Sequence, residues 1–318
     1  MRIFRHLTGL PDFIAGTSVA IGNFDGVHRG HQEVIKAAGS IAREQGMPWG
    51  VLTFEPHPKT FFGGKKLPFL LTPFYMKARY IENLGVDFLV VLEFNETLAQ
   101  TPADEFVLDV LLGVFAAKHL VSGDDFVFGH KRRGTVEFLK AKSVELGFGC
   151  TSVGEVEDGG GAVISSTRIR ELLRAAKPAL AAQLLGHAFE IEGQVTTGEQ
   201  RGRTIGFPTA NIVVDHGIQP CLGGYAIQAA IEGSGGMVWH DGIANLGYRP
   251  TFDGDTCLLE THIFDFSEDI YGKILRVSLV DYIRPEQKFD SIEALKNQID
   301  SDCGLARELL ANRTTEFS

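Results

Sequence analysis

The spacing of hydrophobic residues changes near residue 185 and divides the chain into two differently built halves. Before this point, short apolar runs alternate with stretches whose apolar residues recur every three or four positions, which predicts strands alternating with helices. Val86–Phe94 is almost wholly apolar, as is typical of a strand in a parallel sheet covered on both faces. Thr72 followed by Pro73 predicts a helix that Thr72 caps and that has Pro73 as its first residue. Residues 1–185 are therefore predicted to form an α/β domain of the Rossmann-like type, with ligands at the carboxyl ends of its strands.

The second half, residues 186–318, follows another pattern. Six apolar runs between His187 and Arg284 are separated by turns rich in Gly or Pro, and no helical spacing interrupts them. This pattern predicts a small antiparallel β-barrel. A helical repeat of apolar residues follows Asp290, a residue type preferred at helix N-termini, so we expect a C-terminal helix that Asp290 caps.

The composition limits what kind of protein the chain can be. Its 318 residues carry a formal net charge of −10, which argues against a nucleic-acid partner because such proteins present basic surfaces. No apolar run has the length and lack of charge of a membrane span or a signal peptide, and the four cysteines lie far apart. We therefore expect a cytoplasmic protein with reduced thiols and without membrane or nucleic-acid partners, and leave a homo-oligomer open.

The decapeptide GNFDGVHRGH joins a predicted strand to a predicted helix. Its glycines, among them Gly22 and Gly30 on either side of Phe24, allow the backbone to approach a ligand closely. A helix N-terminus favours phosphate because its N–H groups are unpaired and its dipole is positive there. Imidazoles at this place, those of His28 and His31, suit a reaction in which negative charge grows on phosphate oxygens. The segment predicts nucleotidyl transfer, although such a pair by itself is more often a solvated helix cap, and zinc binding is a further alternative.

A second candidate for phosphate binding opens another predicted helix. The sequence SSTRIR places the hydroxyls of Ser166 and Thr167 at the helix start and the guanidinium groups of Arg168 and Arg170 behind them. Such a set forms a compact phosphate clamp. The alternative is a hydroxyl cap followed by solvated arginines.

In the second half, the sequence GRTIGFPTAN combines flexible glycines with oxygen ligands. Gly202, Arg203 and Gly206 are candidates for phosphate contact. Thr209 and Asn211 offer two neutral oxygens on one face of a predicted strand, which suits a Mg²⁺ ion that already carries nucleotide phosphates.

Glu260 lies in the middle of a later predicted strand. A carboxylate there could accept a hydroxyl proton during phosphoryl transfer. The alternative is an outward-facing strand carboxylate without a chemical role.

These motifs occur together in the order seen in one known family. The chain resembles the bacterial bifunctional riboflavin kinase/FMN adenylyltransferases, or FAD synthetases, in the segments GNFDGVHRGH, TFEPHP, GDDFVFG, SSTRIR, GRTIGFPTAN, GIANLGYRPTF and LETHIFDFSEDIYG. The resemblance implies that ATP phosphorylates riboflavin to FMN in the barrel domain. It also implies that the N-terminal nucleotidyltransferase domain adenylylates FMN to FAD and releases pyrophosphate. Riboflavin, FMN and ATP are then the substrates, and Mg²⁺ is the metal.

The resemblance also implies roles for individual residues. The pair His28 and His31 matches the family's ATP-phosphate motif, and SSTRIR matches its second ATP segment. Thr209 and Asn211 match the magnesium pair, and Glu260 matches the catalytic base. The residues in segments associated with flavin binding are Asp125, His57 and Pro58.

One departure from the family pattern stands beside the expected kinase site, where the sequence from Cys221 to Tyr225 replaces the usual Pro-x-Gly-Val-Tyr. An enzyme with one live activity and a flavin-binding regulator without turnover are the alternative functions. The presence of all five residues that carry the chemistry favours the bifunctional enzyme; these are His28, His31, Thr209, Asn211 and Glu260.

Overall fold

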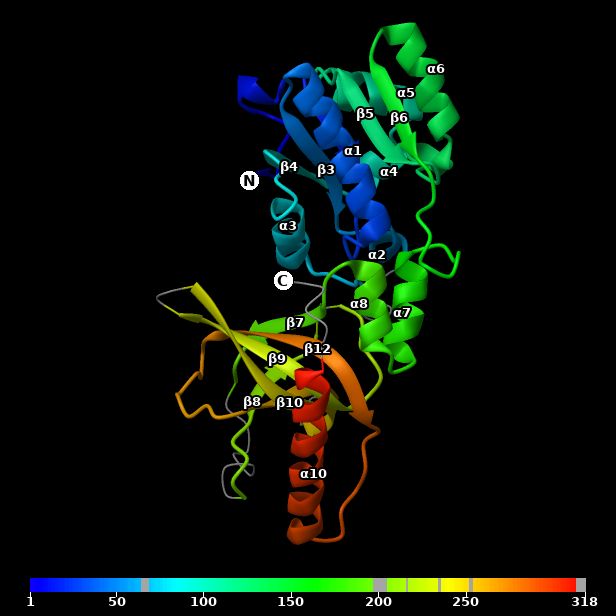
Figure 1. Ribbon diagram of the computed structural model, residues 1–318. Helices are drawn as coiled ribbons and strands as arrows, with labels where there is room; N and C mark the ends of the chain where they lie inside the picture. Colours follow the sequence, from blue (N-terminus) through cyan, green and yellow to red (C-terminus); the bar gives the residue numbers. More distant parts are fainter. Residues whose placement is uncertain (64–68, 197–204, 216, 234–235, 252–253, 313–318) are drawn as a thin grey trace. The chain divides into compact units, whose positions relative to one another are not determined.

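The computed structural model describes residues 1–63, 69–196, 205–215, 217–233, 236–251 and 254–312. The chain divides into two compact units, Met1–Ser166 and Thr167–Ser318, which are coloured from blue to green and from green to red in Figure 1. Each unit has its own sheet. The predicted domain boundary at 185/186 stays a prediction.

The first unit contains a six-stranded, wholly parallel sheet with the strand order β1-β4-β3-β2-β5-β6. Its strands are β1 (Arg2–Phe4), β2 (Ser18–Ile21), β3 (Trp49–Glu55), β4 (Phe88–Glu93), β5 (His119–Gly123) and β6 (Gly149–Val153). Its helices are α1 (Arg29–Gln45), α2 (Pro58–Gly63), α3 (Phe74–Glu82), α4 (Glu96–Gln100), α5 (Ala103–Glu105) and α6 (Val136–Leu146). Its remaining turns are the 3₁₀ turns η1 (Asp12–Ile14) and η3 (His130–Arg132) and the π-helical segment η2 (Phe106–Leu112).

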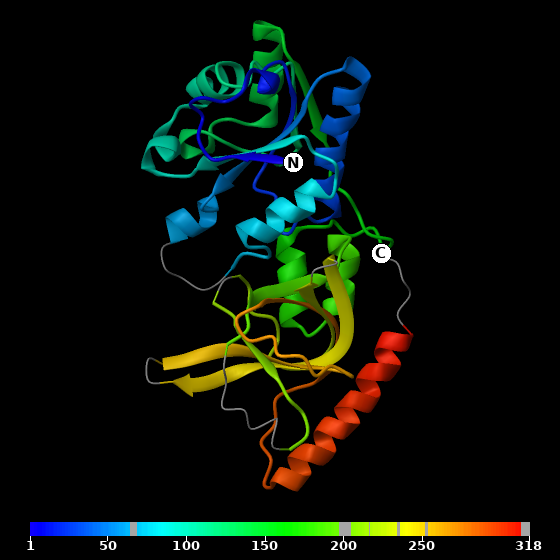
Figure 2. The same cartoon turned by 90° about the vertical axis from the view of Figure 1, so that its left-hand side faces the viewer.

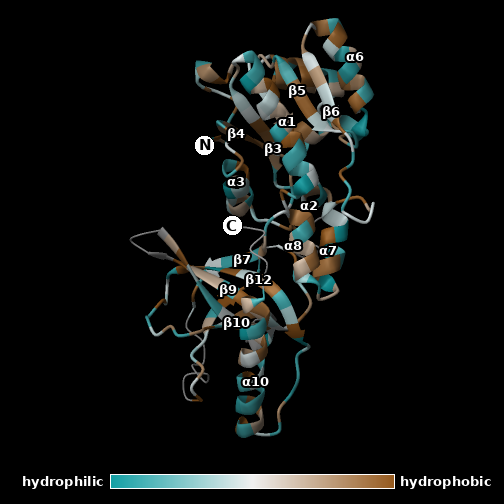
Figure 3. Cartoon of the chain, viewed as in Figure 1, coloured by the Kyte–Doolittle hydropathy of each residue, from teal (hydrophilic) through white to brown (hydrophobic). Residues whose placement is uncertain are grey.

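Alternate strand residues pack against different helices. Ala20 and Val121 share a core with residues of α1 and α3, whereas Ile21 and Leu120 share a second core with residues of η2 and α6. The sheet is therefore covered on both faces, as its apolar strands predict. Helix α6 carries hydrophobic and hydrophilic residues along the same ribbon (Figure 3), which is the composition of a surface helix. The strand order reverses between β2 and β5, which is where sheets of this type bind ligands.

The second unit is the predicted antiparallel barrel. The strand order is β7-β12-β9-β10-β11-β8, and the Thr196 N–H donates to the Asn211 carbonyl at 2.9 Å, which brings the two outer strands together and nearly closes the sheet. Figure 2 shows these strands curving round one another with α10, in red, beside them. The elements are α7 (Ser166–Arg174), α8 (Pro178–Leu185), β7 (Phe189–Gln194), β8 (Ala210–Val213), β9 (Gly223–Gly233), β10 (Gly236–Thr251), β11 (Gly254–Ile263), β12 (Ile274–Arg284) and α10 (Ile292–Ala311).

Two predicted helix starts are wrong by one residue. Pro73, not Thr72, is the N-cap residue of α3, because the Thr72 hydroxyl accepts a hydrogen bond from the Gly26 N–H instead. Ser291, not Asp290, caps α10, and its hydroxyl accepts from the Ala294 N–H at 3.1 Å. Among the described residues, no helix has the length and apolar character needed to cross a membrane.

Candidate active sites

The turn after β2 brings two imidazoles together at the start of α1. His28 is the N-cap residue, and its Nδ1 accepts a hydrogen bond from the His31 N–H at 3.3 Å. The two rings are stacked, with centroids 3.6 Å apart and an interplanar angle of 19°. The ring of Phe24 lies edge-on to His31 at 5.5 Å. The predicted histidine pair is thus a single stacked unit at a helix N-terminus, where anions are favoured.

The backbone of this turn is unusual. Phe24 and Val27 have positive φ angles of 50° and 41°, a conformation that costs a non-glycine residue about 1–2 kcal/mol. A Cβ atom on Gly30 would lie 3.2 Å from the His28 ring, and one on Gly22 would lie 3.0 Å from the Phe24 ring. Both glycines therefore make room for the side chains that shape the turn, and surrounding contacts must hold it in place.

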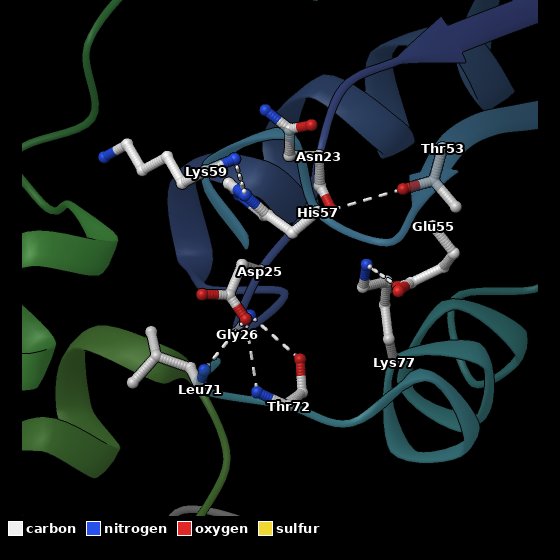
Figure 4. A network of polar contacts seen from close by, with 10 residues as sticks. All are labelled: Asn23, Asp25, Gly26, Thr53, Glu55, His57, Lys59, Leu71, Thr72 and Lys77. Carbon is white, nitrogen blue, oxygen red and sulfur yellow. Dashed lines mark hydrogen bonds and ion pairs between the residues drawn. The ribbon is translucent and has the colours of Figure 1, made fainter. Parts of the chain in front are cut away.

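Those contacts come from distant parts of the chain (Figure 4). The Asp25 side chain is 2% exposed, and its Oδ1 accepts from the N–H groups of Leu71 and Thr72 at 2.9 and 3.2 Å. In return, the Gly26 N–H donates to the Thr72 hydroxyl at 3.0 Å. The Ser166 hydroxyl donates to the Asp25 carbonyl at 2.8 Å. The turn is thus tied to the segment that precedes α3.

We expect Thr72→Val to destabilise the first unit by about 1–3 kcal/mol, because it keeps the side-chain shape and removes the hydroxyl that accepts the buried hydrogen bond from the Gly26 N–H. Thr72→Ser keeps the hydroxyl and is the matched control. Denaturant unfolding of the first unit measures the difference. Equal stability of the two variants would contradict a role for this hydrogen bond.

The residues of the flavin-associated segments lie at the carboxyl ends of strands that flank β2. His57 follows β3 and is buried; its Nδ1 accepts from the Lys59 N–H at 3.0 Å, and its ring packs edge-on against Phe69 with centroids 5.0 Å apart. Pro58 is the first residue of α2. Asp125 is exposed and follows β5 by two residues. The sheet thus places these residues on both sides of the turn after β2.

A buried ion pair at this edge was missed by sequence reasoning. Lys77 of α3 is fully buried, and its Nζ lies 2.6 Å from the Glu55 Oε1 at the end of β3. A buried lysine requires such a partner. The pair fixes α3 against the strand that leads to His57. Lys77 lies on the apolar face of an amphipathic helix. A lysine at such a position indicates a buried charge that needs an acidic partner.

The SSTRIR residues lie at the start of α7. Ser166 is in the first unit and donates to Asp25, as described above. Thr167, Arg168 and Arg170 are in the second unit, where Arg170 is buried. Their role in phosphate binding stays a prediction.

In the barrel, three polar side chains stand in one row. Asn211 on β8 is paired with Glu260 on β11, and Glu260 is paired with Asn245 on β10. Directly paired residues of antiparallel strands point to the same face. Asn211 is 8% exposed, and its Oδ1 has no hydrogen-bond partner among the described residues. A buried amide oxygen without a donor suits a hard cation such as Mg²⁺, so the donor set fits the expected metal.

Neighbouring contacts hold this row. The Arg249 Nη2 lies 2.7 Å from the Glu260 Oε2 and orients the carboxylate. The His262 Nδ1 lies 2.9 Å from the Pro208 carbonyl and ties β11 to the residue before Thr209. Gly206 has a φ of +94°, which favours glycine. The other two phosphate candidates of this segment, Gly202 and Arg203, lie outside the described residues.

The turn that departs from the family pattern is well bonded. The Cys221 N–H donates to the Leu173 carbonyl at 3.0 Å, and the Tyr225 hydroxyl donates to the Cys221 carbonyl. The Tyr282 hydroxyl donates to the Leu222 carbonyl at 3.0 Å. Burial raises the pKa of Tyr282 to about 12, so this hydroxyl stays a donor at neutral pH. Cys221 thus leaves the turn intact.

Comparison with known proteins identifies the family. A FAD synthetase family profile matches residues 11–168, and a riboflavin kinase profile matches residues 185–310. The bifunctional riboflavin kinase/FMN adenylyltransferase of Haemophilus influenzae is 40% identical over 312 residues, which cover 96% of this chain and 98% of that protein. The chain belongs to the bifunctional riboflavin kinase/FMN adenylyltransferase family. The Escherichia coli K12 member is 40% identical over 293 residues and 92% of both chains.

A solved structure shares this fold over almost the whole chain. The crystal structure described as a macrolide-efflux protein from Streptococcus pneumoniae has a TM-score of 0.84 and 33% identity, and the match covers 98% of this chain and 99% of that one. The stacked histidine pair lies in the part that matches FAD synthetase, and the row of Asn211 and Glu260 lies in the part that matches riboflavin kinase. The predicted family, fold class and order of the two activities are confirmed.

Proposed function

We propose that this chain, a bifunctional riboflavin kinase and FMN adenylyltransferase, performs adenylylation with residues 1–185 and phosphorylation with residues 186–318. Both reactions use ATP. The matched ranges 11–168 and 185–310 support this division. Helix α8 packs against β7 and β12 of the barrel. A fragment that is meant to contain the folded barrel should therefore include α8.

In adenylylation, an oxygen of the FMN phosphate attacks the α-phosphorus of ATP, the bond between the α- and β-phosphates breaks, and pyrophosphate leaves. His28 and His31 stabilise the charge that develops on the phosphates, for which their place at the N-terminus of α1 is suitable. Further contacts to ATP come from Gly22, Phe24, Gly30, Ser166, Thr167, Arg168 and Arg170. The flavin contacts are Asp125, His57 and Pro58.

In phosphorylation, a riboflavin hydroxyl attacks the γ-phosphorus of ATP, and Glu260 accepts the hydroxyl proton. Gly202, Arg203 and Gly206 contact the phosphates. Thr209 and Asn211 hold Mg²⁺. The observation that supports this assignment most directly is the buried Oδ1 of Asn211 beside Glu260, which has no hydrogen-bond partner in the part of the chain that the structure describes. When bound, Mg²⁺ neutralises charge on the ATP phosphates.

The proposal is tested by incubating the full chain with riboflavin and Mg-ATP and separating the flavins by chromatography. We expect both FMN and FAD, and neither when a chelator removes divalent metal. The accumulation of FMN without FAD, even at high ATP, would leave only the kinase half of the proposal standing.

We expect Asn211→Ala to raise the Mg²⁺ concentration needed for half-maximal riboflavin phosphorylation by about tenfold or more, because a buried oxygen ligand is lost. Asn211→Asp keeps an oxygen and is the matched control. A metal titration of both variants measures the shift. An unchanged metal requirement in Asn211→Ala would remove Asn211 from the metal site.

The partners are the small molecules riboflavin, FMN and ATP. We further propose a cytoplasmic protein without a nucleic-acid partner, which four cysteines outside any disulfide and the net charge of −10 support. A homo-oligomer stays open.

A further inference from the structure

The carboxylate of Glu260 is held through one of its two oxygens. The Arg249 Nη2 lies 2.7 Å from the Glu260 Oε2, and within the described ranges of the chain this carboxylate forms no other hydrogen bond or ion pair. The Glu260 side chain is 30% exposed and the Arg249 side chain 43%. Oε1 is therefore the oxygen left to receive a proton, on a side chain that is open to solvent.

The sequence of β10 leaves room for the Arg249 side chain. Asn245, Gly247 and Arg249 alternate along this strand and so share one face. Glu260 is paired with Asn245 on the same face. Arg249 lies beyond Gly247 on the strand, so its side chain runs back past this glycine to reach Glu260. A Cβ atom on Gly247 would overlap the Glu286 carboxylate and lie 3.3 Å from the Asn245 Nδ2, so the crowded space beside it admits only glycine.

Glu286 holds the other side of the guanidinium. Its Oε1 lies 3.9 Å from the Arg249 Nη1 and fills the space beside Gly247. Glu286 follows β12 by two residues, and this segment is anchored, since the Arg284 Nε donates to the Oδ2 of the buried Asp302 on α10 at 2.8 Å. The Arg249 guanidinium thus has a carboxylate at each Nη atom, and the second carboxylate belongs to a segment that α10 fixes.

We propose that Arg249, supported by Glu286, is a positioning residue for riboflavin phosphorylation. It holds the Glu260 Oε2, so that Oε1 faces the riboflavin hydroxyl. Oε1 accepts the proton as the hydroxyl oxygen bonds to the γ-phosphorus and ADP leaves. Glu260 is the base in the proposed function, and the inference rests on that role.

The effect of the Arg249 contact on Glu260 is mainly geometric. Both side chains are partly exposed, so solvent screens their attraction, and such pairs contribute little to stability. A glutamate side chain without a partner samples several rotamers, and only some of them direct an oxygen at the substrate. Fixing one of these rotamers beforehand raises the rate without changing how tightly the substrates bind.

We expect Arg249→Met to lower kcat for riboflavin phosphorylation by about tenfold, the scale of the rotamer freedom that one long side chain regains. The KM values for riboflavin and ATP should stay at parent values. Methionine keeps the unbranched stem of the side chain and removes its charge and its donors. Steady-state kinetics of the full chain measure this split between kcat and KM.

A double-mutant cycle shows whether Arg249 acts through Glu260. Once the base is gone, the loss of its positioning residue costs nothing, so Arg249→Met combined with Glu260→Gln should be as slow as Glu260→Gln alone. Glu286→Gln should lower kcat by about twofold to fivefold, as for the loss of an exposed ion pair. This loss should disappear in the Arg249→Met background.

Arg276→Met is the matched control. Arg276 also contacts two carboxylates of the barrel, with its Nη2 2.8 Å from the Glu190 Oε2 and its Nε 3.6 Å from the Glu192 Oε2, but it lies outside the row that contains Glu260. The Glu190 side chain is 8% exposed, so the loss of its partner leaves a buried charge uncompensated. We expect this variant to lower the denaturant midpoint of the barrel more than Arg249→Met does and to keep the parent kcat.

Three results would overturn the inference. The first is an unchanged kcat in Arg249→Met or in Glu286→Gln. The second is a rise in the KM for ATP in Arg249→Met, which would mean that Arg249 binds the nucleotide directly. The third is a further loss of rate when Arg249→Met is added to Glu260→Gln. The failure of the proposed function is distinguishable, because Glu260→Gln alone would then phosphorylate riboflavin at the parent rate.

Discussion

His31→Ala is expected to slow FMN adenylylation by about 100-fold or more and to leave riboflavin phosphorylation unchanged. The imidazole stabilises charge that develops on the ATP phosphates, and the loss of one such donor costs about 10²–10³-fold in rate. The effect should fall on kcat. Since both reactions are carried by one chain, the kinase rate of the same preparation reports whether the variant is folded.

The matching experiment at His28 needs another substitution. His28 caps α1 through its Nδ1, so alanine would also remove a helix cap, at a cost of about 1 kcal/mol. Asparagine is a preferred cap residue and lacks the imidazole, so His28→Asn separates the two roles. We expect it to fold like the parent and to lose adenylylation as His31→Ala does. Parent-level FAD formation by both variants would remove the pair from the mechanism.

Glu260→Gln is expected to slow riboflavin phosphorylation by about 10²–10⁴-fold, the usual contribution of a general base. Glutamine keeps the shape of the side chain and its place in the row with Asn211 but does not accept the proton. FMN adenylylation by the same chain should stay near the parent rate. Steady-state rates of both reactions measure the two effects.

The ion pair with Arg249 makes a control necessary, because Glu260→Gln also removes a charge partner. Glu190→Gln is this control, because it also removes the charge partner of an arginine. Glu190 forms a bidentate ion pair with Arg276 in the same barrel, in which the Arg276 Nε donates to Oε2 and the Nη2 to Oε1, both at 3.0 Å, and it lies outside the row of Asn211 and Glu260. It should change barrel stability without a large loss of kinase rate. If Glu260→Gln phosphorylates riboflavin at the parent rate, the base is another group, or positioning and metal suffice.

The spacing of apolar residues predicted most strands correctly, but the first residues of two helices were predicted less accurately. The apolar runs predicted five strands of the parallel sheet and all six of the barrel, because the tendency of each residue to be buried is written in the sequence itself. β1 was missed, since Arg2–Phe4 is too short for a period to be visible. Asp290 and Ser291 are both good caps, and only the geometry of α10 selects Ser291.

The family motifs and their residues were also visible in the sequence. The pair His28 and His31 are three residues apart at a helix start, so the helix alone brings them together. Thr209 and Asn211 are likewise close in the chain. Chemistry confined to one turn or strand end can be predicted without knowing the fold.

The sequence by itself thus determined the two-part architecture, the family and the residues whose chemistry is local. The tertiary structure alone decided the pairing of Asn211 with Glu260 and the bonds from Asp25 to Leu71 and Thr72. The physical reason is that the burial and backbone conformation of a residue depend largely on residues close to it in the sequence, and the spacing of apolar residues reflects this dependence. A contact between residues about fifty positions apart depends on strand order, register and packing, and single-sequence patterns carry little record of these.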